Sequence, residues 1–160
     1  MKCRYGLTGN LSHFLSRLLQ PIYDRIAMST TFKTSADAID AVEKHHQKGL
    51  LRPDTLFVTL HVHNLSTLVR HTQLVEALQR FLREYIIDGR VQGIPNGSIL
   101  VLVRLFLENQ YLLYDNKLYQ QIRGSYCSSP LTLILVNIYM FYWQHDLVAT
   151  LDRKNETFGR

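Results

Sequence analysis

A nearly unbroken apolar stretch at residues 131–143 constrains the fold of this chain more than any other feature. Thr132 and Asn137 are its most polar members, and Pro130 precedes it. Proline is common at the first position of a helix. A helix that crosses a membrane needs about 20 apolar residues, so this stretch is too short to span one. We therefore predict a long, mostly buried helix from Pro130 to His145 or Asp146, and no membrane partner.

Four other segments carry apolar side chains at the spacing of an amphipathic helix. They are residues 11–22, 36–48, 71–85 and 99–108. Residues that can cap a helix precede three of them: Asn10, Ser35 and Ser98. Pro21 is expected to break or kink the first helix, because proline lacks an N–H group and its ring clashes with the preceding turn.

Two segments are typical of β-structure. Residues 55–62 read T-L-F-V-T-L-H-V, and this content of β-branched and aromatic residues predicts a largely buried strand. Residues 111–122 predict a β-hairpin, because Asp115 and Asn116 tolerate the left-handed turn conformation. The order of elements predicts an α+β fold in which helices pack on a small antiparallel sheet.

The composition suits one globular domain in a reducing compartment. Hydrophobic residues make up 46% of the chain and charged residues 19%, which is enough apolar material for a core. Cys3 and Cys127 form neither a metal-binding spacing nor a disulfide framework, and the N-terminus lacks an apolar signal core. We therefore expect an intracellular protein, with nucleus and cytoplasm both open. The net charge of +5 permits a polyanionic partner without requiring one, because the basic residues are scattered.

Three ordered segments carry a family resemblance. Residues 55–67 read T-L-F-V-T-L-H-V-H-N-L-S-T, and residues 119–131 read Y-Q-Q-I-R-G-S-Y-C-S-S-P-L. They resemble motifs A and B of reverse transcriptases, most closely the Penelope-like retroelement branch, which is related to telomerase. Residues 10–22 resemble the finger segment upstream of motif A. The resemblance covers nearly the whole chain.

The resemblance implies one partial right-hand polymerase domain over residues 1–160. Residues 1–52 would be fingers-like helices and residues 53–151 a palm-like region. Residues 152–160 are polar, and we expect them to form a frayed tail. Residues 157–160 resemble the run that precedes the Y-x-D-D turn of motif C, and that turn is missing. The expectation is therefore a fragment that stops before the catalytic turn and the thumb.

The departures from the family pattern fall on its catalytic residues. His61 stands where motif A has its aspartate, and Ser66 stands where it has an aromatic residue. The family's chemistry uses two Mg²⁺ ions held by carboxylates. Residues 55–62 contain no Asp or Glu, and Asp54 would lie roughly 23 Å from His61 along a strand. We expect no catalytic residue, no Mg²⁺ or other metal cofactor, and no DNA polymerisation by this chain alone.

His61 and His63 would face the same side of a strand, where two imidazoles can chelate zinc. No third ligand is evident in the sequence. The favoured interpretation is a decayed site in which His61 is hydrogen-bonded to water or backbone.

The candidate nucleic-acid-binding residues are Arg123, Gly124 and Ser125. The resemblance places this loop beside the template and the incoming nucleotide, and backbone N–H groups near a helix start can hold phosphate. The alternative is that Gly124 serves only the turn from strand to helix. Five other arginines could line a nucleic-acid channel, although a solvated helix face explains most of them. They are Arg70, Arg80, Arg83, Arg90 and Arg104.

The leading hypothesis is a catalytically inactive reverse-transcriptase-like fragment that binds RNA or DNA weakly and without sequence preference. One alternative is a protein-interaction or structural module, in which a protein partner covers the palm surface that missing strands would leave exposed. A further alternative is an isoform or subunit of an active RNA-directed DNA polymerase completed by another chain. His61 argues against that last alternative.

Overall fold

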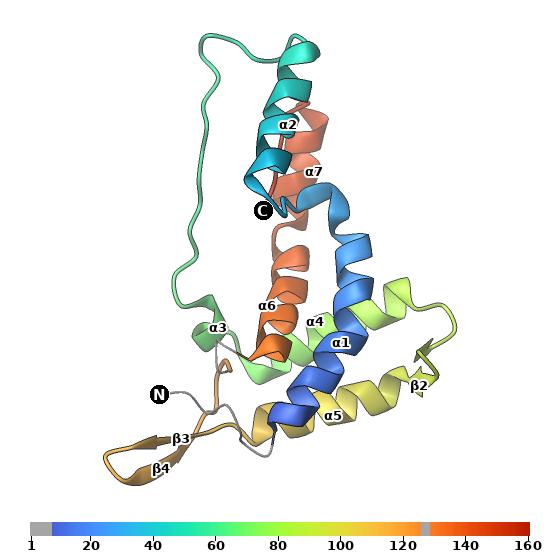
Figure 1. The fold of residues 1–160 in the computed structure, drawn as a ribbon, viewed down its shortest axis with the longest axis vertical. Coiled ribbons are helices and arrows are strands. Elements are labelled where there is room, and N and C mark those ends of the chain that lie inside the picture. The colour runs from blue at the N-terminus through green and yellow to red at the C-terminus, as the bar shows by residue number, and fades with distance from the viewer. Residues whose placement is uncertain (1–7, 126–128) are drawn as a thin grey trace.

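The computed structural model describes residues 8–125 and 129–160. Within these residues the chain has an α+β architecture of seven α-helices and two separate antiparallel sheets of two strands each (Figure 1). The helices are α1 Gly9–Ile26, α2 Ser35–Gln47, α3 Leu65–Leu68, α4 His71–Tyr85, α5 Asn96–Glu108, α6 Pro130–Trp143 and α7 His145–Arg153. The strands are β1 Arg90–Val91, β2 Ile94–Pro95, β3 Tyr111–Tyr114 and β4 Lys117–Gln120. A short 3₁₀ turn, Met28–Thr30, follows α1.

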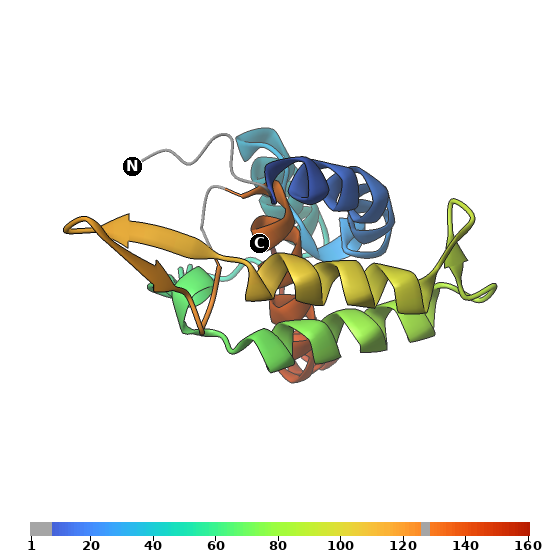
Figure 2. The same ribbon diagram turned by 90° about the horizontal axis from the view of Figure 1, so that it is seen from below.

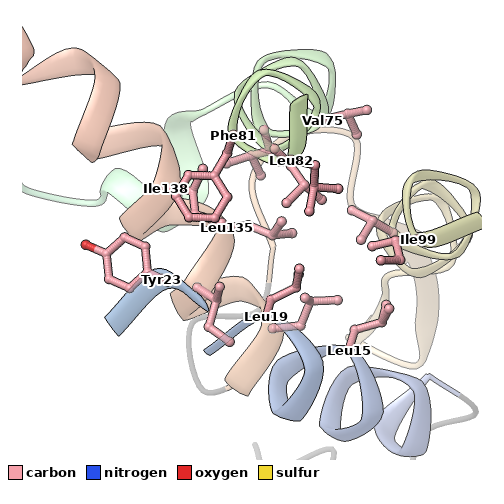
Figure 3. Packing of buried hydrophobic residues seen from close by; sticks show 14 of the residues in the cluster. Leu15, Leu19, Tyr23, Val75, Phe81, Leu82, Ile99, Leu135 and Ile138 are labelled. Carbon is pink, nitrogen blue, oxygen red and sulfur yellow. The ribbon is translucent and has the colours of Figure 1, made fainter. Parts of the chain in front are cut away.

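The core is formed by helices packed on helices. α6 packs against α1 and α4, and α5 packs against α4 and α1. Figure 2 shows α4 and α5 side by side, with α1 on the side of α5 that faces away from α4. Leu19 of α1, Phe81 of α4 and Leu135 of α6 point into this core from three helices (Figure 3). The expected packing of helices on a sheet is therefore wrong, because both hairpins lie at the periphery.

The amphipathic helix expected at residues 71–85 is confirmed as α4, with the same bounds. Its apolar stripe faces α5 and α6, and five of its side chains are buried: Leu74, Val75, Leu78, Phe81 and Leu82. Each fully buried Leu or Phe contributes roughly 1.5–3 kcal/mol. α6 also begins at Pro130 as expected and buries residues on most of its circumference. It ends at Trp143, however, and α7 begins as a separate helix after Gln144.

Of the break or kink expected at Pro21, the break is absent. α1 continues through this residue to Ile26. Pro21 is exposed, and so is Arg17, whose carbonyl loses its helical donor because proline has no N–H. Water can satisfy that carbonyl. Leu18, Leu19 and Tyr23 on the opposite side are buried and hold the helix on the core.

The strand expected at residues 55–62 is absent. This segment has no regular structure, and Leu56, Phe57, Val58 and Leu60 are 72–84% exposed. It runs along the outside of the molecule between α2 and α3 (Figure 1). No backbone group of residues 56–62 bonds to the backbone of another described residue. A segment with strong β-propensity forms a strand only when a neighbouring strand pairs with it, and none does.

The predicted hairpin is confirmed as β3 and β4, which pair from Tyr111 with Gln120 to Tyr114 with Lys117. Asp115 and Asn116 both have positive φ, at 49° and 55°. This matches the two-residue turn whose twist suits a hairpin. All eight strand residues are exposed, so the hairpin projects into solvent (Figure 2).

The frayed tail expected at residues 152–160 is also wrong. The Arg160 N–H donates to the Thr30 carbonyl at 2.9 Å, and the Phe32 N–H donates to the Arg160 carbonyl at 2.8 Å. The side chain of Thr157 bonds to His45 of α2 at 3.1 Å. These bonds dock the tail on the segment that links α1 to α2.

Among the described helices, none has both the length and the apolar character needed to cross a membrane.

Candidate nucleic-acid interface

The loop after β4 crosses the segment that joins α3 to α4. The Gly124 N–H donates to the Val69 carbonyl at 2.7 Å, and the Ser125 N–H donates to the Ser66 carbonyl at 2.8 Å. The Nε2 atom of His71 lies 2.6 Å from the Gly124 carbonyl, which can only accept, so Nε2 carries the proton. Three hydrogen bonds therefore fix the position of this loop on the start of α4.

Gly124 occupies the closest point of this crossing. It is buried and has a φ of 62°, in the left-handed region that favours glycine. A Cβ atom at this position would collide with the backbone of Ser66 and Thr67. Gly124 thus permits the close approach of two backbones, in agreement with the alternative that it serves the turn.

Ser125 lies in the interior and has no exposed surface. Its hydroxyl accepts a 2.6 Å hydrogen bond from the Thr132 hydroxyl of α6 and lies 3.5 Å from the side-chain oxygen of Gln110. Because these partners use the hydroxyl, Ser125 ties the loop to α6. In this conformation it presents nothing to a ligand.

Arg123 is the exposed member of the candidate tripeptide. It pairs with Arg70 in an isolated antiparallel β-bridge. The flanking bond from Gly124 to Val69 makes this a non-hydrogen-bonded pair, in which the two Cα atoms lie about 4.5 Å apart and the side chains project to the same side. The structure therefore adds Arg70 to the candidate site. No local sequence signal predicts this, because the two arginines are 53 positions apart.

Three of the other candidate arginines are less suited to bind nucleic acid. Two of them already bond to groups of the protein, and the third lies beside acidic side chains. Arg80 forms a 2.7 Å ion pair with Glu84. Arg90 donates to the Gly93 carbonyl at 3.1 Å. Arg104 lines a cleft of about 290 Å³ between α4 and α5, together with two glutamates, Glu76 and Glu108.

The ion pair on α4 is part of a small network with α6. The Arg80 guanidinium also lies 4.2 Å from the centre of the Tyr142 ring. Hydrogen bonds from Arg80 and from Tyr142 lower the pKa of Glu84 below its ordinary value. Burial, and then the hydrogen bond to Glu84, raise the pKa of the Tyr142 phenol. This network stabilises the packing of α4 on α6 and leaves Arg80 poorly placed to bind a phosphate.

His61 and His63 are exposed and lie outside regular structure. Their rings nevertheless meet edge to face, with centroids 4.5 Å apart. The described residues contain no group of three or more His, Cys, Asp or Glu side chains that could hold a metal ion. The two imidazoles therefore have no third protein ligand in this part of the chain. Cys127, one of the two cysteines of the sequence, lies outside the described residues.

Comparison of the chain with protein-family models, with curated proteins and with solved structures finds no match to any of them. The resemblance to reverse transcriptases thus depends on the motif residues themselves and stays a prediction.

Proposed function

We propose that the chain is a catalytically inactive, reverse-transcriptase-like fragment that associates with a protein partner, and that this partner is a second copy of the chain. The observation that carries the proposal is the amount of exposed surface. The chain exposes 11436 Å². A compact monomer of 18.7 kDa exposes only about 8,300 Å². The excess is roughly 3,000 Å² per chain, or about 6,000 Å² for two copies, which is enough to supply the roughly 2,000–5,000 Å² that obligate homodimers bury in total.

Two exposed elements support a second copy as the partner, because each has backbone groups that the other could pair with. Residues 56–62 have β-propensity and backbone groups without partners in the described chain. The β3–β4 hairpin has an open edge on each strand and exposed apolar side chains. A two-stranded hairpin is marginal alone, whereas three strands are more stable. Each copy offers both elements, so two copies can satisfy each other around a two-fold axis.

The test is size-exclusion chromatography with light scattering over a range of protein concentrations. The wild-type protein is expected to be a dimer, and Leu60→Asp is expected to be a monomer, because a charge cannot be buried unpaired in the interface. Ile87→Asp is the matched control, since Ile87 is 98% exposed and lies in a turn far from this segment in sequence. A wild-type monomer at all concentrations, with a sharp and reversible melting transition, would contradict the proposal. Capture of a different protein in its place would replace the second copy as partner.

A second candidate function is weak binding of RNA or DNA without sequence preference. The observation that favours it is the exposed Arg123 beside Arg70, on a chain with a net charge of +5. Without a metal site, the affinity would come from phosphate contacts and would fall steeply with salt. A titration of single-stranded RNA at about 50 mM salt tests it.

A further inference from the structure

Arg70 and Arg123 occupy opposite positions of an antiparallel β-bridge, and neither forms an ion pair among the described residues. Like charges directly opposite each other on paired strands are destabilising. The close contacts between basic and acidic side chains among the described residues are Arg80 with Glu84 and His145 with Asp146, and neither includes these arginines. The remaining residues, 1–7 and 126–128, contain no Asp or Glu that could serve as a partner. Neither arginine therefore has an acidic side chain of this chain as an ion-pair partner.

The backbone beneath the pair is fixed. Gly124 is bonded to Val69 on one side, and the side-chain oxygen of Gln73 accepts a 3.1 Å hydrogen bond from the Arg70 N–H on the other. A ligand that binds both side chains would not have to order the backbone first. Such pre-organisation lowers the cost of binding.

The position relative to α4 adds to the positive potential. Arg70 immediately precedes this 15-residue helix. The free N–H groups and the dipole of a helix N-terminus favour an anion. This contribution supports the arginine pair and would not define a site alone.

We infer that Arg70 and Arg123 together bind one phosphate group of a single-stranded nucleic acid. Guanidinium groups bind phosphate oxygens through two parallel hydrogen bonds, which makes a pair of arginines well suited to one phosphate. The inference deepens the second candidate function by naming the residues and the stoichiometry, and it depends on that function for the origin of the phosphate.

The experiment is a double-mutant cycle on the full chain, using fluorescence anisotropy with a labelled single-stranded RNA. Arg70→Gln and Arg123→Gln should each weaken binding about eightfold at 50 mM salt, which is the value of one phosphate contact on a single strand. If both arginines share one phosphate, the double variant should bind about as weakly as either single variant. Two separate phosphates would instead give about a 60-fold loss and would overturn the inference.

The slope of affinity against salt provides a second readout. Sharing predicts that all three variants reduce the slope by about 0.7. Arg25→Gln is the matched control, because it removes an exposed arginine of α1 that is not one of the candidate nucleic-acid-binding arginines. It should change the affinity by less than about twofold. Equal losses of RNA affinity in the control and in the site variants would show that the effect comes from net charge alone. That result would also overturn the inference.

A thermal-shift titration with inorganic phosphate at constant ionic strength separates the site from the function. Phosphate should raise the melting temperature of the wild-type protein and of Arg25→Gln, and it should not raise that of the two site variants. Binding of inorganic phosphate without RNA binding would support the anion site and contradict the nucleic-acid function. RNA binding that neither site variant weakens would support the nucleic-acid function and would overturn the inference that Arg70 and Arg123 bind the phosphate. Absence of both would overturn both.

Discussion

The Tyr142 hydroxyl donates a 2.7 Å hydrogen bond to the Glu84 carboxylate and so joins α6 to α4 at the solvent edge of the core. Arg80 occupies the other carboxylate oxygen at the same distance. Figure 3 shows the interior below this edge, where Phe81 of α4 lies near Ile138 of α6. Polar and apolar contacts thus act on the same pair of helices.

Tyr142→Phe should lower the free energy of unfolding by about 0.5 kcal/mol, at the low end for a hydrogen bond because the carboxylate is exposed. The pKa of Glu84 is lowered in the folded protein. Its contribution is therefore present above the ordinary carboxyl pKa and is lost as the pH falls through the lowered value. Urea unfolding of both proteins at neutral pH and at about pH 3 measures this, and the difference between them should shrink in acid. An equal difference at both pH values would contradict it.

Gly124→Ala should destabilise the protein by about 3 kcal/mol or more, because the alanine would be strained and the backbone of Ser66 and Thr67 would have to move. Gly93→Ala is the matched control. Gly93 also has a positive φ, at 83°, but a Cβ atom there meets nothing within 4 Å. The control should cost about 1 kcal/mol. Denaturant midpoints compare the two, and equal losses would leave only the φ strain as the cause.

Ser125→Ala should destabilise the protein by about 1–2 kcal/mol, since it leaves the buried Thr132 hydroxyl without its acceptor. It should not change RNA affinity. The exposed Ser29 provides the control, and Ser29→Ala should be nearly neutral. Loss of RNA binding by folded Ser125→Ala, at unchanged stability, would return Ser125 to the binding surface.

Chymotrypsin should cut the native protein first after Phe57. This residue is 72% exposed and lies in a segment without backbone hydrogen bonds to the described chain. Mass spectrometry should find the products 1–57 and 58–160, and Phe57→Ala should slow this cut. Protection that increases with protein concentration would support association through this segment. A first cut after an aromatic residue of the buried core would contradict the fold.

The pure protein should not extend a primer in the presence of Mg²⁺. The resemblance to motif A implies that His61 replaces its aspartate, and His61 lies exposed outside any strand. His61→Asp alone should not restore activity, because one carboxylate cannot hold two metal ions. Template-dependent synthesis that EDTA abolishes would refute this prediction.

The parts of the fold that depend on neighbouring residues could be predicted from the sequence. α4 follows from one apolar stripe, and the β3–β4 turn follows from Asp115 and Asn116, because both depend on local geometry. Residues 55–62 could not be predicted in this way, since a strand requires a partner that may come from anywhere. The docking of Arg160 on Thr30 and the pairing of Arg70 with Arg123 are non-local for the same reason. Of the candidate site, the sequence therefore identified the loop but not which of its residues face solvent.

α2 buries none of its residues. It is held by the capping box of Thr34 and Asp37 at its start, by the bond from Thr157 to His45, and by its covalent links, one of which is the exposed segment that leads to α3. Opening of α2 would therefore cost far less free energy than unfolding of the four-helix core, and amide hydrogen exchange would report two separate levels of protection in one chain. We therefore expect a minor population with α2 detached and the core intact, in which Thr157 of the C-terminal residues would lose its bond to His45 and become free for another partner.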